Sequence, residues 1–280
     1  MAMFHPNLLS AVARVGSTDN GLTDTGFFYN APHFSNENQN TTWFVTCKHV
    51  YMGIYHNSAT VLIWINRQDG SGATPVPVPF TDRLNKPLWT VHEEHDVAVF
   101  PVGAVLSDEL QSQVAVEIFP QRDHSLTKSQ AKNSGVSEGD GVFILGFPIG
   151  WQESDHHYPV ARYGIIAQIK GLFDGWHSTY LVDGSAFGGN SGSPVITKFE
   201  VASIQGTSAN SETRLIGMVS AYKNKLTSLD ETPEQQVLTR LSARENADLI
   251  VVIPMDHINE TIDHANNEFR KELGNSEETA

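Results

Sequence analysis

The sequence predicts a mainly β protein with two similar halves and one C-terminal helix. Its 280 residues include 22 glycines and 13 prolines, and turn residues repeatedly interrupt short apolar or alternating runs. Runs of this kind are typical of the strands of a barrel or a sandwich. Near the C-terminus the apolar repeat changes to three or four residues, which indicates a helix.

The first half, residues 1–119, contains five predicted strands. Within it, Thr74–Phe80 carries proline at every second position, which removes backbone donors from one side and favours an edge strand or an extended connector. Residues 120–135 are polar and without a period, so we interpret them as the linker between the halves. The predicted strands are Gly26–Tyr29, Trp43–Thr46, Val61–Ile65, Val97–Val102 and Val114–Phe119.

The second half, residues 136–253, contains six predicted strands, and the helix follows over residues 254–273. The helix has an apolar stripe, which we expect to pack on its own barrel, and Asp256 is expected to cap its first turn. Residues 274–280 are expected to be a flexible tail. The strands are Gly141–Gly146, Gly164–Ile169, Thr179–Val182, Pro194–Thr197, Leu215–Ala221 and Leu249–Ile253, and the stripe is Met255, Ile258, Ile262, Ala265, Phe269 and Leu273.

The net charge and the cysteine content exclude several classes of partner and indicate a cellular compartment. The chain has 18 basic and 32 acidic residues, a net charge of −14, which repels nucleic-acid phosphates and anionic membrane surfaces. No apolar run approaches the roughly 20 residues that span a bilayer, and Leu8–Ala13 lacks the basic residues that precede a secretory signal. The single cysteine, Cys47, excludes an internal disulfide, so we expect a reducing compartment, the cytoplasm.

Three short motifs carry candidate catalytic residues. A serine hydroxyl becomes a nucleophile when a base takes its proton and a third group orients that base. His49 follows a predicted strand, Asp96 immediately precedes one, and Ser191 lies in a glycine-rich turn before another. Each feature alone is more often structural than catalytic. Their order, with the histidine and the acid in one half and the serine in the other, favours a catalytic set.

The glycines around Ser191 have a mechanical purpose. Residues without Cβ atoms let backbone N–H groups converge on one point, which is what a tetrahedral oxyanion requires. We therefore predict an oxyanion hole at Gly189, Asn190 and Ser191, with the N–H groups of Gly189 and Ser191 as its donors.

These motifs resemble those of the chymotrypsin-like (trypsin-like) serine peptidases, especially the disulfide-free bacterial branch that includes the HtrA-type proteins. The resemblance covers roughly residues 25–253. It implies two six-stranded antiparallel β-barrels and a serine endopeptidase that cleaves protein or peptide substrates without a cofactor. The matching segments are Thr46–Val50, His95–Val99 and Gly189–Pro194, with weaker matches at Gly139–Pro148, Tyr163–Ile166 and Leu215–Tyr222.

Departures from the family pattern bear on activation and specificity. Asn190 replaces the aspartate that pairs with a new N-terminus in zymogens, so activation by N-terminal cleavage is not expected. Ser185 replaces an acidic specificity residue, which argues against a strict Lys or Arg preference. Together with Ser220, Ala221 and Tyr222 it forms the predicted substrate-binding set. Tyr222 narrows the pocket, so we expect small or medium apolar P1 residues.

Several other residues resemble a second nucleophile or metal ligands, but a structural role is expected for each. Cys47 is expected to be a buried small residue beside the base rather than a second nucleophile. Asp155, His156 and His157, with His177, are expected to line a mobile loop near the site, and no metal site is predicted. The remaining two histidines of the Asp96 loop are expected to face solvent: His92 and His95.

Two other functions stay open at this point. The chain could be a non-catalytic peptide-binding module that keeps the cleft, or a latent protease whose loops order when a partner binds. Because nothing in the sequence resembles a PDZ or sensor domain, such control would come from a separate regulatory protein.

Overall fold

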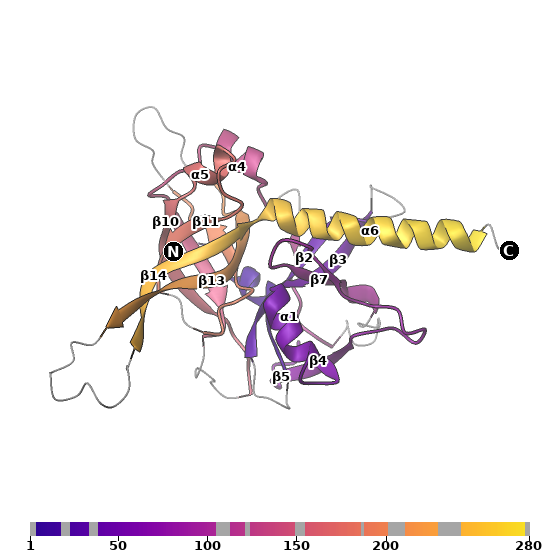
Figure 1. Cartoon of the computed structure of the whole chain (residues 1–280). Coiled ribbons are helices and arrows are strands. Elements are labelled where there is room, and N and C mark those ends of the chain that lie inside the picture. Colours follow the sequence, from indigo (N-terminus) through magenta and orange to yellow (C-terminus); the bar gives the residue numbers. More distant parts are fainter. Residues whose placement is uncertain are drawn as a thin grey trace, which may run out of the picture.

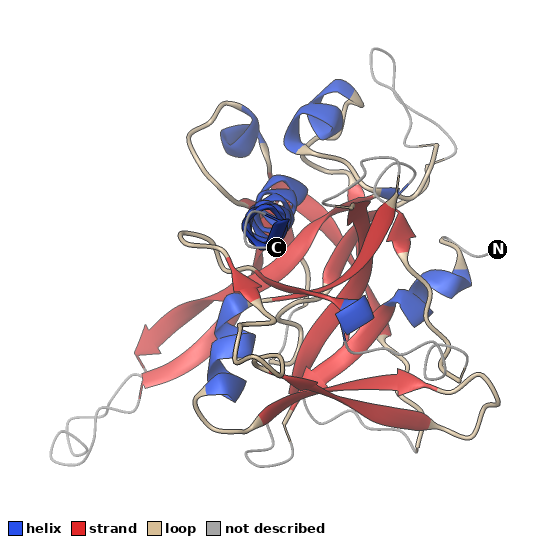
Figure 2. Ribbon diagram, turned by 90° about the vertical axis from the view of Figure 1, so that its right-hand side faces the viewer, coloured by secondary structure: helices blue, strands red, loops and turns tan. Residues whose placement is uncertain are grey.

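Two mainly antiparallel β-sheets form the framework of the protein, one from each half of the sequence (Figure 1). The computed structural model describes residues 4–17, 23–33, 39–104, 113–120, 124–148, 155–185, 188–200, 211–228 and 242–277. Helices are few and lie around the strands (Figure 2). The predicted fold class, mainly β with two chymotrypsin-like β units and a C-terminal helix, is confirmed.

The first sheet has the strand order β5-β4-β1-β2-β3-β7-β6, with β8 paired to β2. Over the described residues it is open between β5 and β6, so this half is a half-barrel rather than the closed six-stranded barrel that we expected. The prolines of β5 explain the open edge, because an edge without N–H donors cannot pair with another strand. The strands are β1 (Val12–Gly16), β2 (Thr23–Pro32), β3 (Asn40–Thr46), β4 (Thr60–Asn66), β5 (Ala73–Pro79), β6 (Thr90–Val91), β7 (Ala98–Pro101) and β8 (Phe119–Pro120).

Two expectations for this half fared differently. The proline-rich segment forms edge strand β5, as predicted. The strand predicted over Val114–Phe119 is mostly wrong, because only a bridge from Arg67 to Val114 and the start of β8 at Phe119 pair there. Short 3₁₀ helices precede β1 and follow β7: η1 (Pro6–Ala11) and η2 (Val102–Ala104).

The second half forms a closed six-stranded barrel in the order β10-β11-β14-β13-β12-β9, as predicted. Strands β9 and β12 have the predicted bounds, whereas β13 and β14 extend as a long hairpin beyond the apolar runs that revealed them. The strands are β9 (Gly141–Gly146), β10 (Val160–Gln168), β11 (Tyr180–Asp183), β12 (Pro194–Thr197), β13 (Leu215–Ser228) and β14 (Ser242–Pro254), with the short helix α5 (Lys170–Phe173) after β10.

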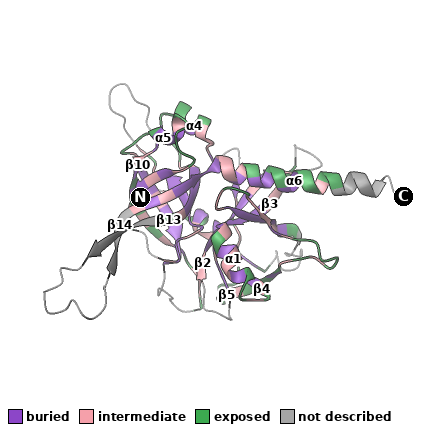
Figure 3. Ribbon diagram, in the orientation of Figure 1, coloured by how far each residue is buried: buried purple, intermediate pink, exposed green. Residues whose placement is uncertain are grey.

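Buried residues lie on the strands of both halves (Figure 3), and their apolar side chains form two clusters, the larger of which also includes residues of the barrel such as Leu145 and Met218. The larger core fills the first sheet with aromatic rings, including Trp43 and Phe44, which are almost completely inaccessible to solvent. The smaller core fills the barrel with branched aliphatic residues such as Ile144 and Val252. Each half therefore has the apolar interior needed to hold its share of a site rigidly.

Helix α6 (Met255–Glu277) continues directly from β14 and runs across the first sheet (Figure 1). Its buried stripe joins the larger cluster, which contains first-sheet residues and also Met218 and Ile253 of the barrel, so the expected packing on its own barrel is only part of its contact. Tyr29 Oη donates a hydrogen bond to Asn259 Oδ1 at 3.1 Å, and Asn266 Nδ2 donates one to the Pro32 carbonyl at 3.0 Å. The helix thus fastens the two halves together.

The helix is longer than predicted. It runs to Glu277 instead of ending at residue 273, and residues 278–280 lie outside the described residues. Among the helices that the structure describes, none has the length and apolar character needed to cross a bilayer.

Asp256 caps a different helix from the one predicted. Its Oδ2 accepts a hydrogen bond of 2.6 Å from the Lys128 N–H, at the start of α4 (Lys128–Asn133). Thr127 and Gln130 complete a capping box at the same helix end. A short helix therefore forms within residues 120–135, and the domain boundaries remain predictions.

Candidate functional site

His49 lies in the first turn of α1 (Lys48–Tyr55), a helix that the sequence analysis missed. Strand β3 ends at Thr46, Cys47 keeps an extended backbone, and the helix then begins. The His49 N–H donates a hydrogen bond of 2.8 Å to Asp96 Oδ1. A carboxylate at the N-terminus of a helix stabilises both partners, because the free N–H groups there attract negative charge.

Asp96 also holds the His49 ring. Nδ1 of His49 lies 2.7 Å from Oδ2 of Asp96, and Ser220 Oγ donates a hydrogen bond of 2.6 Å to the same oxygen. Burial acts to raise the pKa of Asp96, but hydrogen bonds from His49 and Ser220 and the His49 charge lower it overall. The carboxylate is therefore ionised near neutral pH.

The His49 ring responds to the same contact. Its hydrogen bond to Asp96 raises the pKa of His49 against the opposing effect of burial, and the charges of Asp96 and Asp24 raise it further. An imidazole placed in this way accepts a proton readily, because the product cation is stabilised where it forms.

Cys47 is completely buried beside this pair, and its Sγ donates to the Val219 carbonyl at 3.2 Å. Burial, together with the neighbouring carboxylates, raises the pKa of the thiol well above its ordinary value. A neutral, inaccessible thiol is not a nucleophile, so the prediction of a buried small residue here is confirmed.

Ser191 lies in a tight turn between β11 and β12. On one side the turn is bound to β13, because the Gly192 N–H donates to the Val219 carbonyl at 2.8 Å and the Val219 N–H donates to the Ser193 carbonyl at 2.9 Å. Val219 thus contacts both the turn and Cys47, two residues before His49. The barrel strand β13 therefore brings the serine segment and the histidine segment together.

Strand β2 of the first sheet binds the other side of the same turn. The Thr25 N–H donates to the Ser191 carbonyl at 3.0 Å, and Thr25 Oγ1 donates to the Gly189 carbonyl at 2.7 Å. Thr46 Oγ1 in turn donates to the Thr25 carbonyl at 2.8 Å, next to Cys47. The Ser191 turn is consequently clamped at the junction of the two halves.

Two glycines make this close approach feasible. Gly192 has a φ of 87°, in the left-handed region, and a Cβ there would overlap the Thr25 carbonyl oxygen. Gly146 on β9 lies against the back of the turn, where a Cβ would overlap Ser193 Oγ and crowd Asn190 Oδ1. Asn190 and Ser193 of the turn are buried.

Asp24 is a site residue that sequence reasoning missed. Burial raises its pKa to about 6, while the charge of His49 and a hydrogen bond from the Gly189 amide act to lower it. The carboxyl group therefore lies beside both the candidate base and a candidate oxyanion donor. The sequence signal for it was an acidic residue within the polar run Thr23–Thr25, directly before the apolar part of a strand.

The structure does not show a direct contact between Ser191 and the His49 ring. Among the described contacts, no hydrogen bond joins Ser191 Oγ to the His49 ring, and no backbone carbonyl accepts the N–H of Gly189 or Ser191. Catalytic hydrogen bonds often form only when substrate binds, so this geometry is compatible with a reactive site. At the turn, the Gly189 N–H donates to the Asp24 carboxyl group, whereas the described contacts give the Ser191 N–H no acceptor, which leaves it open to an oxyanion.

The comparison with protein families decides which family this arrangement represents. Residues 25–200 match the trypsin-like peptidase domain, a span that includes His49, Asp96 and Ser191. The chain belongs to the trypsin-like peptidase family. Peptidase activity on protein or peptide substrates is the activity of that family, and no curated protein sequence matches the chain significantly.

Two solved structures match this trypsin-like chain over most of its length. The crystal structure of Deg5 has 12% identity and a TM-score of 0.46, with 90% of this chain and 87% of the other covered. The crystal structure of the inactive form of the Rv3671c protease has 14% identity and a TM-score of 0.47, with 94% of this chain and 98% of the other covered.

The predicted substrate-binding residues of this trypsin-like chain differ in how accessible they are to a substrate. Ser185 is exposed, and its carbonyl accepts a hydrogen bond from Arg162 at 3.2 Å. The Ser220 hydroxyl is used on Asp96, so only its backbone is available to a substrate. Ala221 is exposed on β13, and the Tyr222 side chain lies outside the described residues.

Two expectations about histidines are wrong. His157 is held to β4, because its N–H donates to Asn66 Oδ1 at 2.9 Å and Asn66 Nδ2 donates to its carbonyl at 2.8 Å. The Ala73 N–H likewise donates to the Asp155 carbonyl at 2.7 Å, so this segment is fastened to the β4–β5 hairpin. The contacts with the backbone of residues 155–157 thus come from the side chain of Asn66 at the end of β4 and from the N–H of Ala73 at the start of β5.

The other two histidines are half-buried instead of facing solvent. His92 and His95 lie against His257 at the start of α6, a neighbour that the sequence could not indicate. Burial and the neighbouring imidazoles of His257 and His92 lower the pKa of His95.

Proposed function

We propose that the chain is a serine endopeptidase in which Ser191 is the nucleophile, His49 the general base and then acid, and Asp96 the group that orients His49. The distance of 2.7 Å between His49 Nδ1 and Asp96 Oδ2 carries the proposal. With Nδ1 held by the carboxylate, the free nitrogen of the ring, Nε2, is the one able to take a proton from serine.

The reaction would proceed in two stages. His49 Nε2 accepts the Ser191 proton as Oγ bonds to the scissile carbonyl carbon, and the N–H groups of Gly189 and Ser191 stabilise the oxyanion. His49 then gives the proton to the leaving amine, which leaves an ester on Ser191. Water attacks this ester with His49 again as base, and the carboxylate product and the free serine result.

The charge balance of this sequence follows from the site. The imidazolium formed at His49 lies against the ionised Asp96, whose charge is itself held by the His49 backbone N–H and by Ser220. These groups are in place before substrate arrives, so little reorganisation accompanies the reaction.

Substrate recognition would use the strand that carries Ser220. The pairing of β13 with β14 shifts register between Val219 and Ala221, and Ala221 is exposed beside this irregularity. A peptide could therefore add its backbone to this segment. The uncharged Ser185 supports a preference for small or medium apolar P1 residues over Lys or Arg.

Expectations about the compartment, cofactors and partners of the chain belong with this proposal. The single cysteine is a buried thiol, which supports a reducing compartment such as the bacterial cytoplasm. We expect no cofactor, no nucleic-acid partner and no membrane partner. A separate protein that orders the loops remains a proposed form of regulation.

A fluorophosphonate probe tests the proposal directly, because it reacts with an activated serine. The unmodified chain should be labelled and Ser191→Ala should not. Ser193→Ala is the matched control, since Ser193 is completely buried and its Oγ has no hydrogen-bond partner among the described residues. Labelling that survives in Ser191→Ala, or is absent from the folded unmodified chain, would contradict the assignment.

A further inference from the structure

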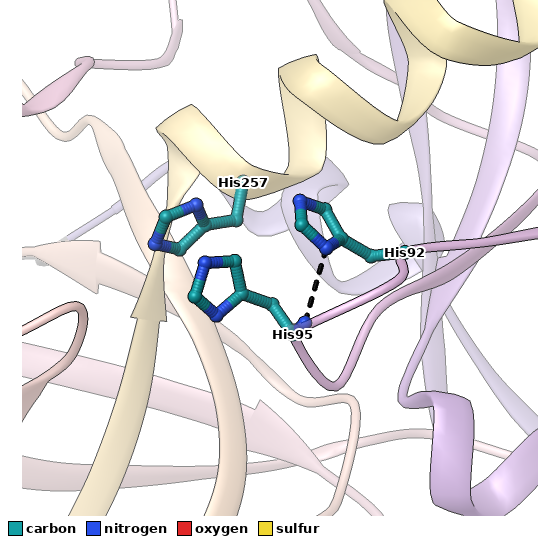
Figure 4. A group of neighbouring side chains, drawn as sticks. All are labelled: His92, His95 and His257. Carbon is teal, nitrogen blue, oxygen red and sulfur yellow. Dashed lines mark hydrogen bonds between the residues drawn. The ribbon is translucent and has the colours of Figure 1, made fainter.

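Two histidines of the loop that precedes Asp96 meet a histidine of α6, which is distant in the sequence (Figure 4). Each of His92, His95 and His257 has a potential ligand nitrogen, and these nitrogens lie within 4.8 Å of one another. The rings of His95 and His257 are stacked at a centroid distance of 3.5 Å, and those of His92 and His95 lie 4.6 Å apart. Such crowding of imidazoles is unfavourable when they carry protons and favourable around a cation.

His257 is already oriented as a metal ligand would be. Its Nε2 lies 3.1 Å from the Ser178 carbonyl oxygen, and its Nδ1 lies 2.8 Å from Glu260 Oε2. Both neighbours are acceptors, but a neutral imidazole has only one N–H. With Nε2 turned to the Ser178 carbonyl, Nδ1 and the Glu260 carboxylate face each other at a separation that one metal ion could join.

His92 has a different part. Its Nδ1 accepts the N–H groups of Glu94 at 3.1 Å and His95 at 3.0 Å, the latter drawn in Figure 4. The ring proton is therefore on Nε2, which lies 3.4 Å from Glu260 Oε2. His92 is thus placed to orient the Glu260 carboxylate and not to bind a metal itself, because its free lone pair is used by the loop.

His95 completes the set. Among the described residues its ring makes no hydrogen bond and is held by ring contacts with His257 and His92. In a tetrahedral site with Zn–N distances of about 2.0–2.1 Å, ligand nitrogens lie about 3.3 Å apart. Metal binding therefore requires the His95 ring to leave its stacked position, and no hydrogen bond of the ring opposes that rotation.

We propose that His95, His257 and Glu260 bind a zinc ion, with water as the fourth ligand and with His92 and the Ser178 carbonyl positioning the ligands. Imidazole nitrogen with one carboxylate suits zinc, whereas calcium prefers an all-oxygen set. The ion would join the loop that ends at Asp96 to the first turn of α6. It lies outside the proposed catalytic mechanism and does not depend on it.

Calorimetric titration of the full-length, chelator-treated chain with zinc chloride tests the site. Ser191→Ala is used as the parent to prevent self-cleavage. One zinc ion should bind per chain, Co²⁺ should give the visible absorption of a tetrahedral complex, and Ca²⁺ should not bind. His257→Ala and His95→Ala should each abolish this binding, while His92→Ala should weaken it by about tenfold or more.

Controls separate this site from other histidines. His56→Ala removes an exposed histidine elsewhere and should leave zinc binding unchanged. His49→Ala should also retain zinc binding. This control is included because Cys47, His49 and Asp96 form a second cluster that could capture the ion. Loss of binding in His49→Ala, unchanged binding in His257→Ala and His95→Ala, or no saturable binding by the parent would each overturn the proposal.

Folding must be checked in parallel. Circular dichroism of each metal-free variant should match that of the parent. If His257→Ala does not fold, His95→Ala decides the question, since His95 lies in a loop and its ring has no hydrogen bond to lose. Zinc should raise the melting temperature of the parent and of His56→Ala, and should leave that of His95→Ala unchanged.

Discussion

Ser220 Oγ and Asp96 Oδ2 are joined by a hydrogen bond of 2.6 Å, which connects the closed barrel to the acid of the first sheet. The same carboxylate receives the His49 ring at 2.7 Å and the His49 backbone N–H at 2.8 Å. The three donors come from two different elements, α1 and β13. Because they fix both carboxylate oxygens, the ring of His49 is oriented by both halves of the molecule at once.

Replacing Ser220 should therefore impair catalysis without affecting folding. Ser220→Ala removes one hydrogen bond to a charged group, so we expect kcat/KM to fall about tenfold, chiefly through kcat. Steady-state hydrolysis of a peptide substrate measures the change. Ser220→Thr keeps the hydroxyl and should retain most of the activity, whereas an unchanged kcat/KM in Ser220→Ala would contradict this role.

Asp24 should control the pH dependence of the rate. Its charge raises the pKa of His49, so Asp24→Asn should lower that pKa and move the acid limb of kcat/KM to lower pH. Because the carboxylate also lies at the Gly189 amide, its removal should increase the plateau rate by relieving repulsion of the oxyanion. Rate profiles from about pH 5 to about pH 9 test both effects. An acid limb that moves to higher pH would contradict the assignment.

The same substitution should change stability with a defined sign. Burial raises the pKa of Asp24 from 3.8 to about 6, so the folded state binds the proton more tightly than the unfolded state. The free energy of unfolding therefore falls as pH rises from 3.8 to about 6, and the full cost remains above that window. Asp24→Asn should be more stable by about 1–3 kcal/mol near neutral pH.

Urea denaturation of Asp24→Asn and its parent, both carrying Ser191→Ala, measures this difference. The two unfolding curves should approach each other as the pH falls below 3.8, because the Asp24 carboxyl then becomes neutral in both states. The exposed Asp183→Asn serves as a control for removal of one negative charge and should not reproduce the effect. A gap that widens at acid pH would refute the burial argument.

The sequence indicated the candidate catalytic residues because each has a local signature. His49, Asp96 and Ser191 all lie at a strand boundary, where an apolar run meets a polar residue, and β9 and β12 were bounded by the same contrast. Helix α1 gave no such signal, since its eight residues mix apolar and aromatic side chains over barely two turns. A helix so short depends on tertiary packing, which a local pattern does not contain.

Long-range neighbours were the part that the sequence could not supply. The period of α6 predicted its apolar stripe correctly but could not tell which sheet would cover Ile258 and Ile262. The contact of His95 with His257 depends on that docking, and so does the capping of α4 by Asp256. Asp24 was missed for a related reason, because its importance comes from His49 and Gly189 on other elements.

Gly192 should be essential for a reactive Ser191, because a side chain there would overlap Thr25 in addition to straining the backbone. Gly192→Ala places a Cβ on the Thr25 carbonyl oxygen at a residue with a φ of 87°. The turn must then move away from β2, and we expect fluorophosphonate labelling of Ser191 to fall by about 10²-fold or more, as misplaced oxyanion donors and nucleophile would require. The melting temperature should fall as well.

Gly139→Ala is the matched control for this prediction. Gly139 also has a left-handed φ, 93°, but a Cβ there meets nothing within 4 Å. Its replacement should cost only the conformational strain, about 1–2 kcal/mol, and leave labelling nearly intact. If both alanine variants lost labelling equally, backbone strain alone would account for the effect and the contact between Gly192 and Thr25 would not be needed. A large loss confined to Gly192→Ala would show that β2 of the first sheet holds the serine turn of the barrel in its reactive position.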